Sequence, residues 1–187
     1  MRKLFGGMLL ASLVVLAAAP AQAQRRATGN SMGGAEHELG VDLGAAYVKP
    51  NGVSGGLVIL TPVDVRFGFV PRSGNLMWEP RGTLSISTVG GTTTYMITPS
   101  INVLYANSPG GHHRGMYLTG GAGLVLSDNG TNSGTQVQLG AGVGWRKPYG
   151  SGAWRYEVGF QWTSENTTLG VPSTIAIGGR IGISLWH

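Results

Sequence analysis

The side chains with the clearest chemical potential are charged residues that recur at alternate positions in several segments of the chain. The cations at these positions are all arginines, and carboxylates lie two residues away, as with Glu79 and Arg81. Arginine is favoured over lysine where an ion pair is buried and its geometry is bidentate. We therefore predict a buried network of arginine and carboxylate pairs. Its predicted members are Asp42, Asp64, Arg66, Glu79, Arg81, Arg146, Arg155, Glu157 and Arg180.

Residues that often serve in catalysis or metal binding are few. The chain has no cysteine and four histidines, at positions 37, 112, 113 and 187. The adjacent pair His112 and His113 lies in a connection without a nearby carboxylate, so solvated polar residues are expected there rather than metal ligands. The glycines at 140, 142 and 144 superficially resemble a nucleotide-binding loop, but no helix follows them. We predict no catalytic residue, no metal site and no cofactor.

The elements that must position the charged residues are strands. From Glu36 to the end of the chain, apolar residues occupy alternate positions in eight segments, each closed by a turn rich in Gly, Pro, Asn or Ser. A period of two is typical of a strand with one apolar face. The fold class predicted for residues 36–187 is all-β, an eight-stranded antiparallel up-and-down transmembrane β-barrel with both ends in the periplasm. The predicted strands are 36–48, 56–70, 75–88, 93–106, 115–127, 135–147, 153–163 and 174–186.

The segment before the first predicted strand has the pattern of an export signal. Arg2 and Lys3 precede an apolar run over 8–19, and small residues stand at Ala21 and Ala23. That run is shorter than the roughly 20 residues a spanning helix needs. We predict a cleaved signal peptide over 1–23 and a flexible periplasmic leader over 24–35.

The charge of the chain excludes a nucleic-acid footprint. The formal net charge is +5, and without Arg2 and Lys3 the basic residues exceed the acidic ones by only three. Most of the remaining basic residues are scattered singly, so no stripe follows a phosphate backbone. We predict no nucleic-acid partner.

The position of the aromatic residues indicates which face of the barrel is outside. The polar parity carries Gly, Ser, Thr, Gln and charge, whereas aromatic residues lie on the apolar parity towards the strand ends. Two aromatic belts around an aliphatic band suit a bilayer, because amphipathic rings favour the headgroup level. The polar parity is then predicted to face a lumen. The predicted girdle comprises Tyr47, Phe67, Phe69, Trp78, Tyr95, Tyr105, Trp145, Trp154, Tyr156 and Trp162.

In strand number and pattern, residues 36–187 resemble the small eight-stranded outer-membrane barrels of the OmpA and OmpX kind. The last strand, with Gly182, Ile183 and Leu185 before a terminal aromatic, is similar to the assembly signal of such proteins, although Trp186 falls on the inward parity. The resemblance implies a monomer in the outer membrane. Its implied partners are outer-membrane lipid, lipopolysaccharide and, through the last strand, the barrel-assembly machinery.

Turn signals also suggest registers. A four-residue loop over 71–74 would place Phe67 opposite Trp78, and on the inner face Arg66 opposite Glu79 and Asp64 opposite Arg81. A similar loop over 148–151 would place Trp145 opposite Trp154 and Gly142 opposite Glu157. A final loop centred near Leu169 would bring Arg180 within reach of Glu157.

The function predicted from these features is a structural or envelope-integrity role, with a lumen filled by charge pairs. The alternative is a narrow or gated channel for small solutes or ions, kept open by the inward glycines at 121, 123, 140, 142 and 144. A lipid-modifying enzyme would need a Ser, His and acid set, and no histidine here is followed two residues later by Ser. A soluble lipocalin-like carrier would need an apolar cavity with charge outside.

Overall fold

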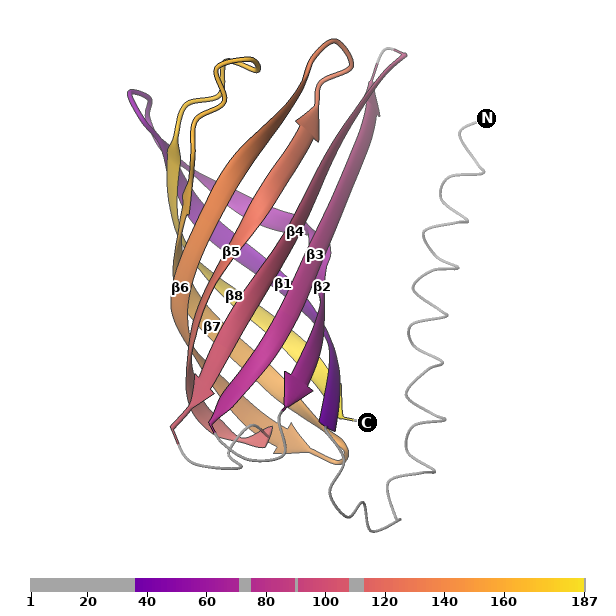
Figure 1. The fold of residues 1–187 in the computed structure, drawn as a ribbon, viewed down its shortest axis with the longest axis vertical. Helices are drawn as coiled ribbons and strands as arrows, with labels where there is room; N and C mark the ends of the chain where they lie inside the picture. Colours follow the sequence, from indigo (N-terminus) through magenta and orange to yellow (C-terminus); the bar gives the residue numbers. More distant parts are fainter. Residues whose placement is uncertain (1–35, 71–74, 90, 108–112, 187) are drawn as a thin grey trace.

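The computed structural model describes residues 36–70, 75–89, 91–107 and 113–186, and within them the chain forms a closed ring of eight antiparallel strands (Figure 1). The predicted signal peptide and leader lie outside the described residues. Each strand pairs with the next in sequence, and the first closes the ring against the last. The strands are β1 (Glu36–Pro50), β2 (Gly56–Val70), β3 (Leu76–Val89), β4 (Thr92–Ala106), β5 (Gly115–Asp128), β6 (Ser133–Tyr149), β7 (Gly152–Thr163) and β8 (Thr174–Trp186).

The barrel has two distinct ends, which we call the base and the mouth. The base carries the start of β1 and the end of β8, where Glu38 lies opposite Trp186. The mouth carries the connections that follow β1, β3, β5 and β7, at the upper end of Figure 1. The predicted all-β fold, a closed barrel of eight antiparallel up-and-down strands, is confirmed, and both β2 and β8 have the predicted bounds.

The alternation of side chains follows from the pleat of the strands. Large apolar residues of one parity are exposed on the outer surface, as with Leu43 on β1, Ile86 on β3 and Val158 on β7. Most residues of the other parity point inwards and are buried or half-buried, although Val58 and Met96 near the mouth are exposed. No helix in the described part of the chain is long and apolar enough to cross a membrane.

The register predicted for β2 and β3 is wrong by two residues. Phe69, rather than Phe67, lies opposite Trp78, and Arg66 lies opposite Arg81. Glu79 and Asp64 are therefore not the directly opposed partners of Arg66 and Arg81. A shift of two keeps every side chain on its face, so the hydrophobic pattern does not distinguish the two registers.

The predicted register of β6 and β7 is wrong in the same way. Trp145 lies opposite Tyr156 rather than Trp154, and Gly144 rather than Gly142 lies opposite Glu157. The reason is that pairing continues through Pro148 and Tyr149, which leaves a turn of two residues. Gly150 begins that turn with a φ of 48°, a left-handed conformation that suits a tight hairpin. In contrast, the register that places Glu157 opposite Arg180 is confirmed.

The inner face is not entirely polar, which corrects the predicted composition of that parity. Val70, Met77, Leu104 and Tyr117 form a small buried cluster, and the half-buried Trp186 packs against it. These side chains come from β2, β3, β4, β5 and β8 and lie towards the base. The base of the lumen is thus filled by an apolar layer.

Candidate functional site: the charged lumen

All nine residues of the predicted charge network lie on the inner parity of their strands. Seven are buried, and the pair Asp64 and Arg180 is half-buried. A tenth charged residue, Glu38, is also fully buried and was missed by the sequence prediction. Among the described residues, the lumen therefore holds five arginines and five carboxylates. A balanced set of this kind allows every buried charge to have an opposite neighbour, which burial requires.

Arg66 on β2 is the centre of the first group of contacts. Its Nε and Nη2 donate to the two carboxylate oxygens of Asp42 at 2.7 and 3.1 Å. Its Nη1 donates to Glu38 and, at 3.1 Å, to the Ser184 hydroxyl. Glu38 also accepts a hydrogen bond from Arg146 Nη2 at 2.6 Å. Strands β1, β2, β6 and β8 are thereby joined through the interior.

Glu79 on β3 is held by two arginines. Arg81 Nε donates to Glu79 Oε1 at 2.6 Å, and Arg155 on β7 donates to both carboxylate oxygens. Arg66 lies 3.8 Å from Glu79, so the predicted proximity of these two residues holds as an ion pair although they are not register partners. The Glu79 side chain is completely buried.

Glu157 on β7 receives three donors. Arg81 forms two hydrogen bonds with its two oxygens, at 3.1 and 3.0 Å, and Arg155 Nη2 donates at 2.6 Å. The hydroxyl of Tyr117 donates to the same carboxylate at 3.0 Å and itself accepts a hydrogen bond from Arg155 Nε. Arginine and carboxylate groups from opposite walls thus fill the middle of the lumen. We call the eight residues other than Asp64 and Arg180 the charge cluster.

Asp64 and Arg180 form a separate ion pair nearer the mouth. Arg180 Nη1 lies 2.9 Å from Asp64 Oδ2, and both side chains are partly exposed. The predicted partners were different, Arg81 for Asp64 and Glu157 for Arg180. Arg180 is opposite Glu157 in register, but Glu157 is already bound by Arg81, Arg155 and Tyr117. Arg180 therefore binds Asp64 instead, the carboxylate that no other arginine binds in the described part of the chain.

Three polar residues that contribute to the charge cluster were not predicted, namely Glu38, Tyr117 and Ser184. A signal for Glu38 existed, because it has the same parity as Asp42. Tyr117 likewise has the same parity as the inward glycines at 121 and 123. Arg146 and Arg155 both lie over the Tyr117 ring, each 4.9 Å from its centroid, a distance at which cations interact with aromatic faces.

Glycine provides the space that these large side chains occupy. A Cβ built on Gly40 would overlap the guanidinium group of Arg66, and one on Gly144 would overlap the Tyr117 ring. Both glycines are on the inner face, so a side chain at either position would displace a member of the cluster. At these two positions glycine accommodates the network, whereas the inward glycines at 121, 123 and 140 line a cavity nearer the mouth.

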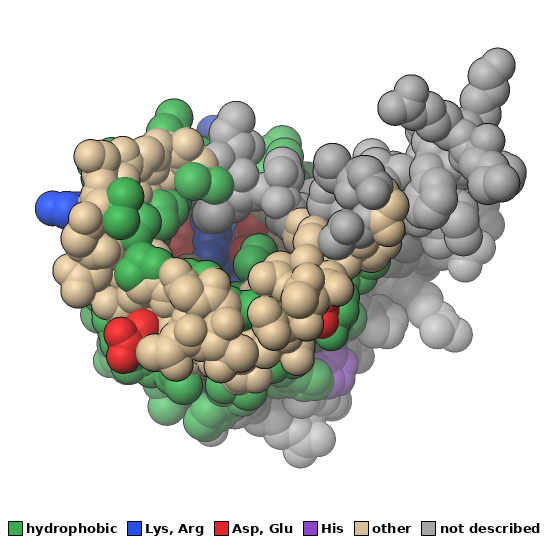
Figure 2. All heavy atoms as spheres, turned by 90° about the horizontal axis from the view of Figure 1, so that it is seen from above, with side chains coloured by type: hydrophobic (Ala, Val, Ile, Leu, Met, Phe, Trp, Pro, Cys, Tyr) green, Lys and Arg blue, Asp and Glu red, His purple; other side chains and the backbone are tan. Residues whose placement is uncertain are grey.

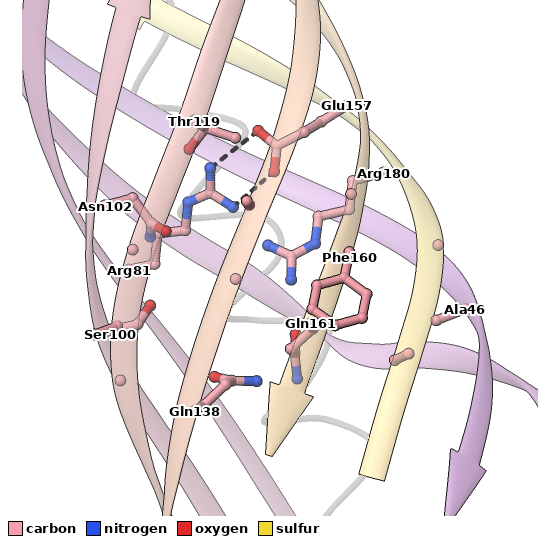
Figure 3. Close-up of a pocket in the computed structure, with 18 residues that line it drawn as sticks. Ala46, Arg81, Ser100, Asn102, Thr119, Gln138, Glu157, Phe160, Gln161 and Arg180 are labelled. Atoms are coloured by element: carbon pink, nitrogen blue, oxygen red, sulfur yellow. Dashed lines mark hydrogen bonds and ion pairs between the residues drawn. The ribbon is translucent and has the colours of Figure 1, made fainter.

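Towards the mouth, the lumen is open. Figure 2 shows the mouth as a hollow at the centre of the molecule, with charged side chains at its bottom. Two adjoining cavities of about 90 and 270 Å³ share Arg81, Ser100, Gln138, Gln161 and Arg180 as lining residues. The Arg81 and Glu157 pair lines the smaller, deeper cavity (Figure 3). We call the two cavities together the vestibule.

The ten residues of the predicted girdle lie on the outer parity. Nine have exposed side chains, and Trp162 is half-buried. Phe67, Phe69 and Trp78 lie near the base, and Tyr47 and Tyr95 lie near the mouth. Among the charged side chains whose exposure the structure describes, the exposed ones lie at strand ends or in connections, at Lys49, Arg114, Lys147 and Glu165.

The described residues contain no group of three or more His, Asp or Glu side chains that could hold a metal ion. His112 and His187 lie outside the described residues. His113 stacks on Trp186 with 4.0 Å between ring centroids, and His37 contacts Phe69 edge-on.

No protein-family model matches the chain, and no curated protein is similar to it in sequence. Among solved structures, Neisserial surface protein A matches with a TM-score of 0.50 and 11% identity, over 80% of this chain and 96% of that one. The attachment invasion locus protein Ail of Yersinia pestis gives a TM-score of 0.48 at 9% identity, over 82% and 99% of the two chains. The N-terminal β-barrel domain of Pseudomonas aeruginosa OprF gives 0.40 at 11% identity, over 79% and 97%. The likeness to Neisserial surface protein A shows that the chain has the fold of a small eight-stranded barrel.

Proposed function

We propose that this chain is an integral outer-membrane barrel with a structural role in the cell envelope, and that its lumen is closed by the charge cluster. The observation that carries the proposal is the distribution of polarity in the barrel. Charges are paired inside, and the outer surface between the strand ends is apolar. A soluble barrel has the reverse arrangement, with an apolar interior and a charged exterior.

The energetics of the interior support a closed structure. Removing one partner of a buried ion pair costs about 3–5 kcal/mol, because an uncompensated charge is left behind. Each carboxylate in the charge cluster has at least one arginine within hydrogen-bonding distance. The cluster ties strands on all sides of the ring to each other, which stabilises a closed barrel.

The same proposal includes the partners expected of such a barrel. The exposed apolar band contacts outer-membrane lipid and lipopolysaccharide, and the last strand is recognised by the barrel-assembly machinery. The ring of strands is complete without a second chain, because β1 pairs with β8 along most of its length. The protein is then a monomer without enzymatic activity.

Membrane fractionation and an electrophoretic heat test examine this proposal directly. Closed outer-membrane barrels resist detergent at room temperature, so the unboiled protein is expected to migrate differently from the boiled protein. It is also expected to sediment with outer membranes. Recovery as a soluble periplasmic protein, with identical migration before and after boiling, would contradict the proposal.

A narrow gated channel is the second candidate, and the vestibule favours it. The vestibule enters the lumen from the mouth and ends at the Arg81 and Glu157 pair. If that pair exchanged partners with its neighbours, a water path would still have to pass the apolar layer around Met77 and Leu104. Conductance in planar bilayers separates the two candidates.

A further inference from the structure

The vestibule combines a defined volume with one accessible opening. The larger of its two cavities holds about 270 Å³, slightly below the roughly 300–1,000 Å³ of sites for drug-sized ligands. The floor of the vestibule is the Arg81 and Glu157 pair, and its walls are formed by residues of all eight strands, most of them on the inner face. It has the size of a site for one small solute.

The charges that line the vestibule are already paired. Arg81 is bound to Glu79 and Glu157, and Arg180 is bound to Asp64. These groups are balanced, so the site has no surplus charge with which to attract an ion. An anion or a cation entering it would have to displace an existing partner, and the ligand expected on electrostatic grounds is therefore neutral.

Amide and hydroxyl groups line the space between these charges. The side chains of Gln138 and Gln161 have no hydrogen-bond partner among the described residues, and both line the two cavities. Gln138 and Gln161 lie on the paired strands β6 and β7, two residues apart in register, and Figure 3 shows their amide groups directed into the vestibule, which Ser100 also lines. Each amide offers donors and an acceptor, which suits a ligand with neighbouring hydroxyl groups.

One part of the wall near the mouth is apolar. Met96 on β4 and Val125 on β5 line the larger cavity, opposite the side that carries Gln161 and Thr163 on β7. A sugar ring has a polar rim of hydroxyls and a less polar face of C–H groups. The vestibule offers a surface of each kind, whereas a simple amide or alcohol would leave one of them uncovered.

We propose that the vestibule binds a small neutral polyhydroxylated solute, the size of a single sugar ring, with Gln138 and Gln161 as its principal hydrogen-bonding residues. This binding goes beyond the structural role proposed above. Because the floor is closed by the charge cluster, the solute enters and leaves through the mouth. A site of few hydrogen bonds and small buried area binds weakly, with a Kd on the order of millimolar.

Nuclear magnetic resonance of the full chain, folded in detergent micelles and labelled with ¹⁵N-glutamine, tests this inference. The probes are D-glucose, D-glucuronate and D-glucosamine, which share a ring but differ in charge. Glucose is expected to shift the side-chain amide signals of Gln138 and Gln161 in a saturable manner, and the two charged sugars to bind about tenfold more weakly. Absence of saturable shifts with glucose, or tighter binding of glucuronate, would overturn the proposal.

Two variants test whether the shifts of the glutamine amide signals are caused by binding in the vestibule. A side chain at Gly140 points into the smaller cavity, and its Cβ meets only the Phe160 carbonyl at 3.4 Å, so Gly140→Leu is expected to fill the space without a backbone clash. Gly120→Leu is the matched control, because Gly120 is on the outer parity of the adjacent strand and a Cβ there has only one neighbour, at 3.8 Å. Glucose binding is expected to be lost in the first variant and retained in the second.

A second variant covers the case in which Gly140→Leu fails to fold, as judged by the electrophoretic heat test. In Gln138→Leu combined with Gln161→Leu, the hydrogen-bonding groups are removed with little change in volume. The remaining glutamine in the vestibule, Gln136, donates to the Ser164 carbonyl at 2.6 Å and serves as the reporter signal. We expect at least about tenfold weaker glucose binding. Unchanged affinity in this variant would contradict the proposed site.

Discussion

Arg81 on β3 and Glu157 on β7 face each other across the barrel, four strands apart, and are joined by two hydrogen bonds of 3.1 and 3.0 Å. In a ring of eight strands, a separation of four strands is the largest there is. The pair therefore spans the lumen and forms the floor of the vestibule. Its bidentate geometry requires a planar guanidinium group, which explains arginine at this position.

The first prediction concerns the stability of this pair. Glu157→Ala leaves Arg81 without one of its two carboxylates and removes a partner of Arg155, so we expect the free energy of unfolding to fall by about 3–5 kcal/mol. Adding Arg81→Ala should recover part of this loss. Urea unfolding of protein folded in lipid vesicles measures both variants, and strict additivity in the double-mutant cycle would show that the two residues do not interact.

The control for this cycle is Glu165→Ala. Glu165 lies in the connection between β7 and β8 and is exposed. Its removal changes the formal charge by the same amount as Glu157→Ala but strands no buried arginine. We expect a change within about 0.5 kcal/mol.

The second prediction concerns the glycines that face the charge cluster. A Cβ on Gly40 would overlap the Arg66 guanidinium, so Gly40→Ala should displace that side chain from Asp42 and Glu38. We expect destabilisation of about 1–3 kcal/mol, as for other overpacked interiors. Gly120→Ala, on the outer face, should be neutral within error, and equal effects of the two changes would mean that Arg66 is not held against Gly40.

Much of the fold could be predicted from the sequence because a period of two fixes the face of each side chain. Arg66, Glu79 and Arg155 are inside and Phe69 and Trp78 are outside whichever register the hairpins adopt. The registers at the base could not be predicted from turn composition. Pro148 and Tyr149 look like loop residues, yet they continue the pairing of β6 with β7 up to Gly152.

The partners within the lumen were less predictable than its composition. Local sequence suggested pairs between neighbouring strands, but arginine side chains are long enough to cross the lumen. Glu38 and Arg146 are 108 residues apart and still form a hydrogen bond. Which acid an arginine binds depends on its height in the barrel and on competing partners, and neither is encoded in the spacing of one hairpin.

The third prediction tests the membrane-facing surface with two matched valines. Val158 in the middle of β7 and Val53 in the connection after β1 are equally exposed, at 59% of their surface. In lipid, Val158→Arg should cost about 2–4 kcal/mol, since the charge would lie in the hydrocarbon region. Val53→Arg should cost less than about 0.5 kcal/mol. Equal and small effects in vesicles would contradict insertion of the barrel in a bilayer.

The last prediction separates the structural role from the channel. The purified unmutated protein in a planar bilayer should show only rare, small openings, because the charge cluster and the apolar layer at the base occlude the lumen. Glu157→Ala should increase their frequency by removing the floor of the vestibule, and adding Met77→Ala should increase it further by opening the apolar layer. Arg180→Ala should have a smaller effect than Glu157→Ala, since Arg180 pairs with Asp64 where the lumen is already wide.

The control variant for these recordings is again Glu165→Ala, which should behave like the unmutated protein. Each variant must first pass the electrophoretic heat test, so that changes in conductance are not attributed to unfolded material. Steady, large conductance from the unmutated protein would favour the channel over the structural role. It would also mean that the charge cluster and the apolar layer at the base do not together occlude the lumen in a bilayer.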